Sequence, residues 1–499
     1  MESKTRKMNI REEARRCLLC VDAPCSQACP TGDPARAIRA IRFDNETLAG
    51  QWVAACSDAD LLAAEEACIH YDRPIRISEL VRTVCHDDAA AGAPVGSSLE
   101  ELAKTSLAID FCGIPCENPF FLASSAVCTN YDMVARAFDM GWGGVFYKTI
   151  CKKEIREVSP RFDAVKNGTE IEGFRNMEQL SENPYLTDFD ILRRLKQNYP
   201  TKVVIASIMG QYEEEWIELA KLAEEVGCDA VELNFSCPQM RLAGMGSDVG
   251  QDLELVVFYT TYVKRAVSIP VIPKMTPNIT HIAEPAIGAY FAGADAISAI
   301  NTIKSITMSP LAEVNQKKTV SGYSGKAVKP IALRHILEMS SHQIMKRLHT
   351  VQFSGIGGIE TWRDALDFML LGCRNVQVCT AVMQYGYRII DDLLLGMQAY
   401  LRQRGISKLE DIVGEEVPNF VLPSELDRDT VVYPKIDLSS CMGCGRCQLS
   451  CQDGGHQAIV FDTATRQPRI VGSKCVGCHL CRLVCPTGAI GVTRRVRKK

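Results

Sequence analysis

Long hydrophobic runs are absent from this 499-residue sequence, and no apolar stretch approaches the roughly 20 residues that a membrane-spanning helix needs. The segment from Met1 to Arg16 is polar and charged, without the apolar core of a secretory signal. Neither charge is in excess, with 56 Lys and Arg against 60 Asp and Glu. The sequence therefore indicates no basic face for nucleic acid. We expect a soluble cytoplasmic protein that binds neither membranes nor nucleic acid.

A dinucleotide-binding fingerprint is also absent. No G-x-G-x-x-G followed by an acidic residue occurs in the chain, although this pattern marks the pyrophosphate loop of NAD- and FAD-binding folds. If the protein is a redox enzyme, we expect its electrons to arrive from a partner protein.

Cysteine, in contrast, is abundant. The chain has 23 Cys, and most of them gather before residue 86 or after residue 440. In a sequence without an export signal, so many Cys indicate metal clusters in a reducing compartment rather than disulfides.

The spacing C-x2-C-x2-C-x3-C occurs twice near the C-terminus. It holds two [4Fe-4S] clusters in bacterial ferredoxins, where the fourth Cys of each run binds the other cluster. One cluster is therefore assigned to Cys441, Cys444, Cys447 and Cys485, and the other to Cys475, Cys478, Cys481 and Cys451. Zinc or disulfides explain two interlocked sets of four poorly, because a zinc site needs only one set. Two neighbouring clusters can pass electrons one at a time. We therefore expect the part of the chain before them to catalyse a redox reaction.

The middle of the chain alternates short apolar segments with amphipathic ones, which is typical of a parallel sheet covered by helices. Helical spacing is clear at Glu213–Val226 and Leu253–Ala266. Eight strands are expected, at Pro119–Ser124, Gly144–Thr149, Lys202–Ile208, Ala230–Phe235, Val271–Met275, Ala296–Asn301, Val351–Gly355 and Val376–Thr380. Eight units in about 300 residues favour a closed (β/α)8 TIM barrel, of the α/β class, over an open doubly wound sheet.

Polar residues follow several of these strands. Barrel enzymes carry their chemistry at the carboxyl ends of the strands, so these residues are candidates for a site. They are Ser124, Ser125, Lys148, Asn234, Cys237, Lys274, Asn301, Thr302, Gly357, Gly358, Cys379 and Thr380. Buried polar groups without partners are costly, so their convergence predicts a polar ligand. The glycines after strand seven, with Cys379 and Thr380 after strand eight, suit a phosphate cradle of backbone N–H groups.

Four segments carry a family resemblance: Glu232-Leu-Asn-Phe-Ser-Cys-Pro238, Ile300-Asn-Thr302, Ser321 to Pro330, and Gly355-Ile-Gly-Gly-Ile359. With the C-terminal clusters, they resemble the dihydropyrimidine dehydrogenase branch of the dihydroorotate dehydrogenase-like flavoproteins. The resemblance covers residues from about 105 to the C-terminus. It implies that the barrel binds FMN and reduces the 5,6 double bond of uracil or thymine, or catalyses the reverse reaction.

The resemblance also implies roles for individual residues. Cys237 would donate the proton to C5 of the pyrimidine, and a thiol with an ordinary pKa near roughly 8.5 can act as a general acid at neutral pH. The pyrimidine would be bound by Asn176, Glu178, Asn234, Ser236, Asn301 and Thr302. FMN would be bound by Ser124, Ser125, Lys148, Lys274, Gly325, Gly357, Gly358, Cys379 and Thr380. The family further implies an oligomer and a separate FAD-containing subunit that oxidises NADH or NADPH.

Two other functions fit parts of the sequence. A dihydroorotate dehydrogenase or another flavin ene-reductase would share the barrel, although orotate would need an additional cation for its carboxylate. An electron-transfer subunit with an inactive barrel would share the clusters, although Cys237, the three Asn and the two Lys argue against it.

The N-terminal Cys resemble those of the helical iron–sulfur domain that precedes the FAD reductase of glutamate synthase and dihydropyrimidine dehydrogenase. By that resemblance, one [4Fe-4S] cluster is held by Cys17, Cys20, Cys25 and Cys68. A second set is incomplete: Cys29 matches and Cys56 lies close to a ligand position, but the other two positions fall at Ala64 and near Val81, which cannot bind iron. We therefore expect one N-terminal cluster, with a second either lost or rebuilt from Cys56 and other groups. A local cluster of Cys29 with Cys17, Cys20 and Cys25 is the alternative. The expected domains are therefore a helical iron–sulfur domain at 1–100, the barrel at 101–430, and an α+β ferredoxin-like domain at 431–499.

Overall fold

The computed structural model describes residues 9–88, 98–168, 170–238, 240, 245–308, 319–342 and 351–498. Most of the expected linker at 86–98 lies outside these residues. Contacts divide the chain into two compact units, of which one is Glu13–Asn419 and the other is Phe420–Lys499 grouped with Met1–Glu12. None of the described helices is long and apolar enough to cross a bilayer.

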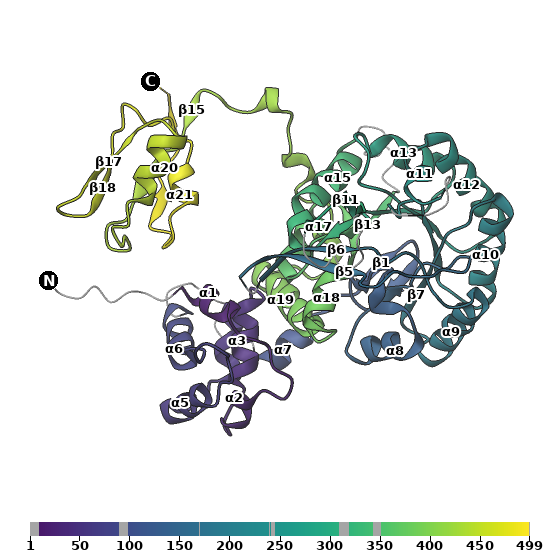
Figure 1. The fold of residues 1–499 in the computed structure, drawn as a ribbon, viewed down its shortest axis with the longest axis horizontal. Helices are drawn as coiled ribbons and strands as arrows, with labels where there is room; N and C mark the ends of the chain where they lie inside the picture. The colour runs from purple at the N-terminus through teal and green to yellow at the C-terminus, as the bar shows by residue number, and fades with distance from the viewer. Residues whose placement is uncertain are drawn as a thin grey trace. The chain divides into compact units, whose positions relative to one another are not determined.

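The larger unit contains a closed barrel of eight parallel strands (Figure 1). Around the barrel the strands are β3 (Phe120–Leu122), β4 (Gly144–Phe146), β7 (Val203–Ile208), β8 (Ala230–Asn234), β9 (Val271–Lys274), β10 (Ala296–Ala299), β13 (Gln352–Ile356) and β14 (Cys373–Val378). The predicted (β/α)8 fold is confirmed, and every expected strand segment holds one barrel strand. The last strand begins at Cys373, three residues before its predicted start.

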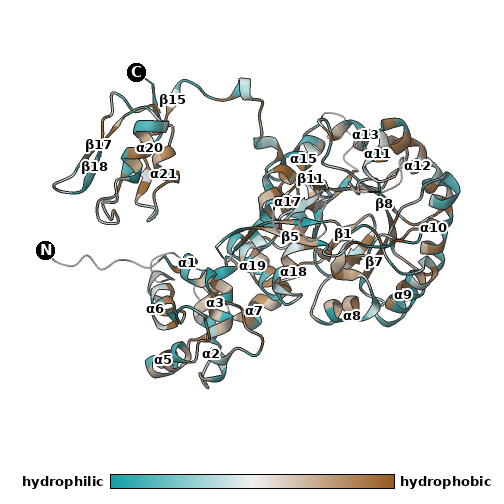
Figure 2. Cartoon of the chain, in the orientation of Figure 1, coloured by the Kyte–Doolittle hydropathy of each residue, from teal (hydrophilic) through white to brown (hydrophobic). Residues whose placement is uncertain are grey.

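One long helix follows each barrel strand. The eight helices are α8 (Tyr131–Asp139), α9 (Tyr185–Asn198), α10 (Glu213–Glu225), α12 (Leu253–Ala266), α13 (Ala283–Phe291), α15 (Lys329–Ser341), α17 (Trp362–Leu370) and α19 (Ile389–Arg404). Hydrophobic and hydrophilic residues alternate along these helices (Figure 2). In α10, for example, Trp216, Leu219, Ala220 and Ala223 are buried, at the spacing of one helix face. Short helical turns complete the connections: η2 (Ala126–Cys128), α11 (Ser247–Gly250), η3 (Lys326–Val328), α18 (Thr380–Tyr385), η4 (Leu409–Ile412) and η5 (Val417–Asn419). A further turn, η6 (Pro423–Glu425), belongs to the smaller unit.

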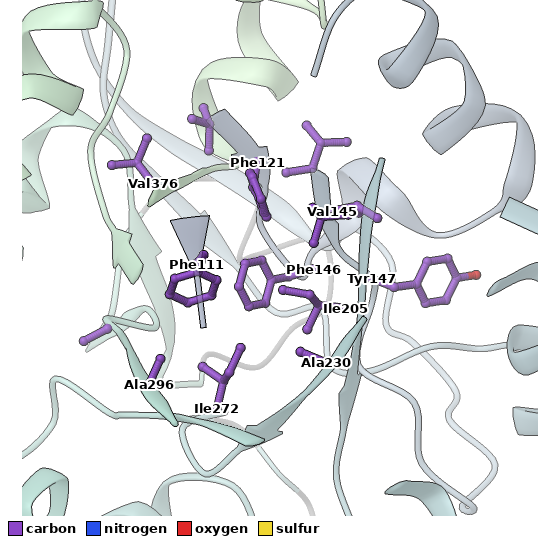
Figure 3. Packing of buried hydrophobic residues seen from close by; sticks show 14 of the residues in the cluster. Phe111, Phe121, Val145, Phe146, Tyr147, Ile205, Ala230, Ile272, Ala296 and Val376 are labelled. Carbon is purple, nitrogen blue, oxygen red and sulfur yellow. The ribbon is translucent and has the colours of Figure 1, made fainter. Parts of the chain in front are cut away.

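A small hairpin closes the amino-terminal end of the barrel. It consists of β1 (Ile109–Phe111) and β2 (Ile114–Cys116), which pair antiparallel. The Cys112 amide donates a hydrogen bond to the side chain of Gln352, the first residue of β13, at 2.9 Å. Phe111 is fully buried and lies among Phe121, Phe146 and other barrel residues (Figure 3). Because this end is filled, a ligand must enter from the other end.

A four-stranded antiparallel sheet stands at the carboxyl end of the barrel. In spatial order its strands are β11 (Ile303–Ser305), β12 (Ser321–Ser324), β6 (Glu170–Asn176) and β5 (Phe162–Asn167). Asn176 pairs with Gly322 on one side and with Phe162 on the other. This pairing fixes which face of the sheet the Asn176 side chain occupies, since a slip of one residue would turn it to the opposite face.

Short helices form the N-terminal part of this unit. They are α1 (Ile10–Arg15), α2 (Pro24–Gln27), α3 (Pro34–Arg42), α4 (Glu46–Ala49), η1 (Gly50–Trp52), α5 (Asp58–Glu66), α6 (Ile77–Asp88) and α7 (Leu99–Ala103). Asp33 caps α3, and a capping box of Ser57 and Asp60 starts α5. Phe43, after α3, belongs to the same buried cluster as the barrel residues. The helical part is therefore attached to the barrel through a shared apolar core.

Residues 420–498 of the smaller unit form an α+β fold of three antiparallel strand pairs and two α-helices. Antiparallel pairs form between β15 (Thr430–Val431) and β20 (Val496–Arg497), β16 (Pro434–Ile436) and β19 (Ile490–Val492), and β17 (Ile459–Asp462) and β18 (Gln467–Ile470). The helices are α20 (Arg446–Gly454) and α21 (Leu480–Leu483). The small core includes Cys447, Cys451 and Cys481 beside Ile459 and Ile490, so the Cys side chains point inward.

Candidate active site and cluster-binding cavities

The carboxyl ends of the barrel strands surround one pocket. The residues predicted for the site, either from strand ends or from the family resemblance, line it with one exception. Those that line it are Ser124, Ser125, Lys148, Asn176, Glu178, Asn234, Cys237, Lys274, Asn301, Thr302, Gly325, Gly357, Gly358, Cys379 and Thr380. Ser236 does not line this pocket; it is fully buried behind the wall.

A chain of hydrogen bonds holds two of the pocket amides. The Asn301 amide nitrogen donates to Ser236 Oγ at 2.9 Å, and this hydroxyl donates to Asn234 Oδ1 at 2.8 Å. The Asn234 amide nitrogen in turn donates to Thr149 Oγ1 at 2.9 Å. These bonds fix the orientation of both amides, so each presents its remaining hydrogen-bonding groups in a set direction. Ser236 is thus a positioning residue in this geometry.

Two ammonium groups line the pocket, and each has a carboxylate neighbour. Lys148 Nζ lies 3.3 Å from Glu178 Oε1, and Lys274 Nζ lies 3.7 Å from Glu232 Oε1. The side chains of Lys148 and Lys274 are both 4% exposed. Among the described lining residues, no other Lys or Arg is present. Each ammonium group of the pocket therefore lies beside one carboxylate.

Glu232 lies one layer below the pocket and was not predicted as a site residue. Its carboxylate accepts hydrogen bonds from Ser207 Oγ at 2.9 Å and from Ser298 Oγ at 2.8 Å, and it is fully buried. Ser207 also hydrogen-bonds Thr149 at 3.0 Å, so this layer is continuous with the amide chain. The i, i+2 spacing from Glu232 to Asn234 places both on the same face of β8, a sequence signal that could have identified it.

Glycines shape the side of the pocket after strand seven. Gly357 and Gly358 both have positive φ, at 127° and 75°, which other residues rarely adopt. A Cβ on Gly358 would lie 2.8 Å from the Lys329 backbone nitrogen, so only glycine fits there. In the same pocket lining, Ser324 Oγ and Thr380 Oγ1 are 2.9 Å apart. The close backbone approach and the hydroxyl pair make a cradle for a small anionic group.

Glu360, two residues beyond this glycine pair, also lines the pocket and was missed from the sequence. Burial raises the pKa of its carboxyl to about 7, and the nearby Lys326 opposes that shift only in part. One carboxyl oxygen, Oε1, is buried and has no hydrogen-bond partner among the described residues. A carboxyl group in this position is easily protonated near neutral pH.

The eight C-terminal Cys line two separate cavities. One cavity is lined by Cys441, Cys444, Cys447 and Cys485, and the other by Cys451, Cys475, Cys478 and Cys481. The two Cys loops share a geometry, since Gly443 and Gly477 both have positive φ and so do Gly445 and His479. The structure thus brings together the two interleaved sets expected from the spacing.

The N-terminal Cys whose side chains the structure describes form two groups. Burial raises the pKa of Cys17 and, to about 11, that of Cys25, and Cys20 and Cys68 are among the neighbouring thiols that raise both. Cys29 has its sulfur 3.1 Å from Cys56 Sγ, and neither of these two thiols is among the named neighbours that shift the pKa of Cys17 or Cys25. Ala64 and Val81 are buried side chains in α5 and α6.

Comparison with known proteins shows the family to which this chain belongs. Residues 106–401 match the family model of dihydroorotate dehydrogenase. The chain belongs to the dihydroorotate dehydrogenase family. In addition, residues 434–492 match a 4Fe-4S dicluster domain, which implies two clusters in the smaller unit.

Within the family, the chain is similar to dihydropyrimidine dehydrogenases and to dihydroorotate dehydrogenases. It is 52% identical over 391 residues to the NAD-dependent dihydropyrimidine dehydrogenase subunit PreA of Escherichia coli (strain K12), with 77% of this chain and 94% of that protein covered. The chloroplastic dihydropyrimidine dehydrogenase (NADP(+)) of Arabidopsis thaliana is 36% identical over 351 residues, covering 67% of this chain and 82% of the relative. The catalytic subunit of dihydroorotate dehydrogenase B (NAD(+)) of Pyrococcus furiosus is 36% identical over 317 residues, covering 62% of this chain and 98% of that protein.

Proposed function

We propose that this chain is the catalytic subunit of a dihydropyrimidine dehydrogenase, which reduces the 5,6 double bond of uracil or thymine or catalyses the reverse reaction. The observation that carries the proposal is the meeting of Asn176, Asn234 and Asn301 with the Cys237 thiol in one pocket. A pyrimidine base alternates carbonyl and N–H groups along its edge, and carboxamides supply both the donors and the acceptors for such an edge.

The pocket also suits FMN, which the dihydroorotate dehydrogenase family implies. The glycine cradle of Gly357 and Gly358, with Ser324 and Thr380 in the same lining, fits a phosphate. Lys148 and Lys274 would flank the ring system, where positive charge stabilises an anionic reduced flavin. Ser124, Ser125, Gly325 and Cys379 line the same space. Bound there, FMN supplies the hydride for C6 of the pyrimidine.

The protein's own residues orient the pyrimidine base and supply one proton. The three amides, with Thr302 and Glu178 beside them, hold the base so that its C5 faces Cys237. The Cys237 thiol then gives its proton to C5, and the thiolate that remains takes a proton back before the next turnover. Cys237 is 5% exposed, so bulk water has little access to the position where this proton moves.

A neutral pyrimidine fits better than orotate. Orotate carries a carboxylate, which needs an unpaired cation, and the two ammonium groups of the described pocket lining already face Glu178 and Glu232. Dihydroorotate dehydrogenase activity is therefore the second candidate, supported by the similarity to the Pyrococcus furiosus protein.

Electrons would reach the flavin through clusters. The two C-terminal sets of four Cys and the N-terminal set of Cys17, Cys20, Cys25 and Cys68 would each hold a [4Fe-4S] cluster. A separate FAD-containing subunit that oxidises NADH or NADPH would supply the electrons, since the Escherichia coli relative is named as a subunit of an NAD-dependent enzyme. About twelve irons and one FMN per chain, without FAD, are the expected content.

The test compares uracil, thymine and orotate as substrates for the anaerobically purified holoenzyme with a reduced dye as electron donor. We expect turnover of uracil or thymine and little turnover of orotate. Cys237→Ala should lower kcat by about 10²- to 10⁴-fold while flavin content and KM stay close to wild type. The matched control is Cys228→Ala, which alters a buried Cys outside the pocket. Faster turnover of orotate would favour the second candidate, and a fully active Cys237→Ala would point to an electron-transfer subunit with an inactive barrel.

A further inference from the structure

Cys29 and Cys56 form a close pair of thiols that the proposed function does not use. They are 27 residues apart in the chain, yet their sulfur atoms lie 3.1 Å from each other. Cys29 follows α2 and Cys56 follows η1, so two separate turns of the helical domain bring the sulfurs together. Two thiols at this separation are close enough to exchange a proton or to form a bond.

The pair is distinct from the proposed cluster site. The thiols whose charges affect Cys17 and Cys25 belong to the set of four, whereas Cys56 interacts with Cys29, Thr31 and Asp60. The helix positions where a second cluster would need further ligands hold Ala64 and Val81, whose side chains cannot bind iron. Two thiols alone do not complete a four-ligand cluster site.

The surrounding structure keeps the two sulfurs in place. Gly32 packs directly against Cys56, because a Cβ at this position would overlap the Cys56 sulfur. The Asp33 amide donates to the Trp52 carbonyl oxygen at 2.9 Å, which ties the turn of Cys29 to the turn of Cys56. Thr31 Oγ1 donates to Asp60 Oδ2 at 3.0 Å and adds a second tie to α5. The approach of the sulfurs is therefore fixed by contacts on both sides.

We propose that Cys29 and Cys56 are a reversible thiol–disulfide couple whose co-reactant is a small-molecule disulfide of the glutathione class. Cys56 is partly exposed and Cys29 is 3% exposed, so Cys56 meets the co-reactant and Cys29 completes the reaction. The helical domain would then hold a two-electron sulfur couple beside a one-electron cluster.

The reaction balances in two exchanges. Cys56, as thiolate, attacks one sulfur of the small disulfide, forms a mixed disulfide and releases one small thiol. Cys29, losing its proton, attacks Cys56 Sγ and releases the second small thiol. In sum, two protein thiols are oxidised to one disulfide, and one small disulfide is reduced to two thiols.

The exchange should depend on pH. Burial, followed by the hydrogen bond with Cys29, raises the pKa of the Cys56 thiol to about 11. Since the thiolate is the attacking species, the rate at low concentrations of the small disulfide should rise nearly tenfold for each pH unit from 7 to 9.

The test treats the full-length, anaerobic holoenzyme with oxidised glutathione, alkylates the remaining thiols and maps the peptides by mass spectrometry. We expect a Cys29–Cys56 disulfide that a dithiol reductant reverses, with the visible absorbance of the clusters unchanged. Cys29→Ser should leave glutathione attached to Cys56, whereas Cys56→Ser should leave Cys29 unmodified. Cys116, a buried Cys in β2, is the internal control and should stay reduced.

Two results would overturn the proposal. One is that Cys29 and Cys56 remain fully alkylated after this treatment, or become linked only after cluster absorbance is lost. The other is that the double variant Cys29→Ser/Cys56→Ser loses about four irons per chain, which would make both thiols cluster ligands. Neither result depends on which pyrimidine the barrel reduces.

Discussion

At the scale of single residues, the barrel interior holds a buried carboxylate, that of Glu232, below the pocket. Glu232 faces Lys274 and accepts hydrogen bonds from two serines. The sequence predicted Lys274 from its place at a strand end, but it did not predict the partner. The i, i+2 spacing to Asn234 indicates which face of β8 Glu232 occupies. Its contacts with Ser207, Ser298 and Lys274 join three other strands, so no local sequence pattern predicts them.

We predict that Glu232→Leu lowers the free energy of unfolding by about 3–5 kcal/mol, since it leaves the buried Lys274 ammonium without a counter-charge. Urea unfolding measures the change. Ser298→Ala is the matched control, because it removes only one hydrogen bond to Glu232 and should cost about 1 kcal/mol. A Glu232→Leu protein as stable as the control would show that this carboxylate does not neutralise Lys274.

Glu360 should make stability depend on pH. The pKa of its carboxyl is about 7 in the folded protein and near 4.5 when unfolded, so the folded state binds this proton more tightly. Its stabilising effect is complete below about pH 4.5 and is lost as the pH rises through 7. Glu360→Gln cannot ionise and escapes this loss. From pH 5 to pH 8, the stability of the variant relative to wild type should increase by about 2.5 kcal/mol.

Unfolding in urea at several pH values, with flavin removed, measures this difference. Glu154→Gln, which changes a largely exposed carboxylate, should keep the wild-type pH dependence. If Glu360→Gln and wild type lose stability in parallel, Glu360 is ionised in the folded protein throughout this range.

At the scale of elements, the apolar periodicity of the sequence predicted all eight barrel strands and the two helices singled out from their spacing. The apolar periodicity did not predict the antiparallel sheet. Its strand β5 is half-exposed with polar residues such as Lys166 and Asn167, so it lacks the continuous apolar run of a barrel strand. Asn176 was therefore assigned to the site through family resemblance alone, and only tertiary pairing brings it over the pocket.

Contact between α3 and α19 holds the helical domain to the barrel. Arg39 Nε lies 2.8 Å from Asp392 Oδ2, and both side chains are less than 10% exposed. Burial raises the pKa of the Asp392 carboxyl to about 6, although Arg39 and Arg36 oppose the shift. Burying this ion pair therefore costs a large desolvation free energy. We interpret its role as fixing the orientation of α3 against α19.

We predict that Arg39→Leu destabilises the protein by about 3–5 kcal/mol, because Asp392 then stays buried without its nearest cation. The double variant Arg39→Leu/Asp392→Leu should recover most of that loss, since no unpaired charge remains. Thermal unfolding and limited proteolysis of the helical domain measure both. A double variant as unstable as Arg39→Leu would indicate that the pair itself supplies the net stabilisation.

At the scale of the whole molecule, the boundary between the compact units falls at Asn419 and Phe420. A chain that ends at Asn419 should fold, keep about one FMN and lose about eight irons, because each missing cluster holds four. Dye-driven reduction of the pyrimidine should persist, while reduction driven by the electron-donating subunit should fall to background if the C-terminal clusters lie on its route. Iron and flavin analysis with both assays provides the measurement. A shortened chain without flavin would show that the barrel depends on the C-terminal unit.

Aromatic rings of the barrel are covered by the helical domain. Trp362 donates its indole N–H to the Asp44 carbonyl oxygen at 3.0 Å, and Tyr385 meets Phe43 edge-on at 5.2 Å between ring centroids. A truncated protein that begins near residue 100 would expose these rings to water and create an apolar surface patch that favours aggregation. Such a variant should give poor soluble yield. Loss of activity in that variant would then reflect precipitation. The proposal that an N-terminal cluster relays electrons is therefore better tested with Cys68→Ser in the full-length chain.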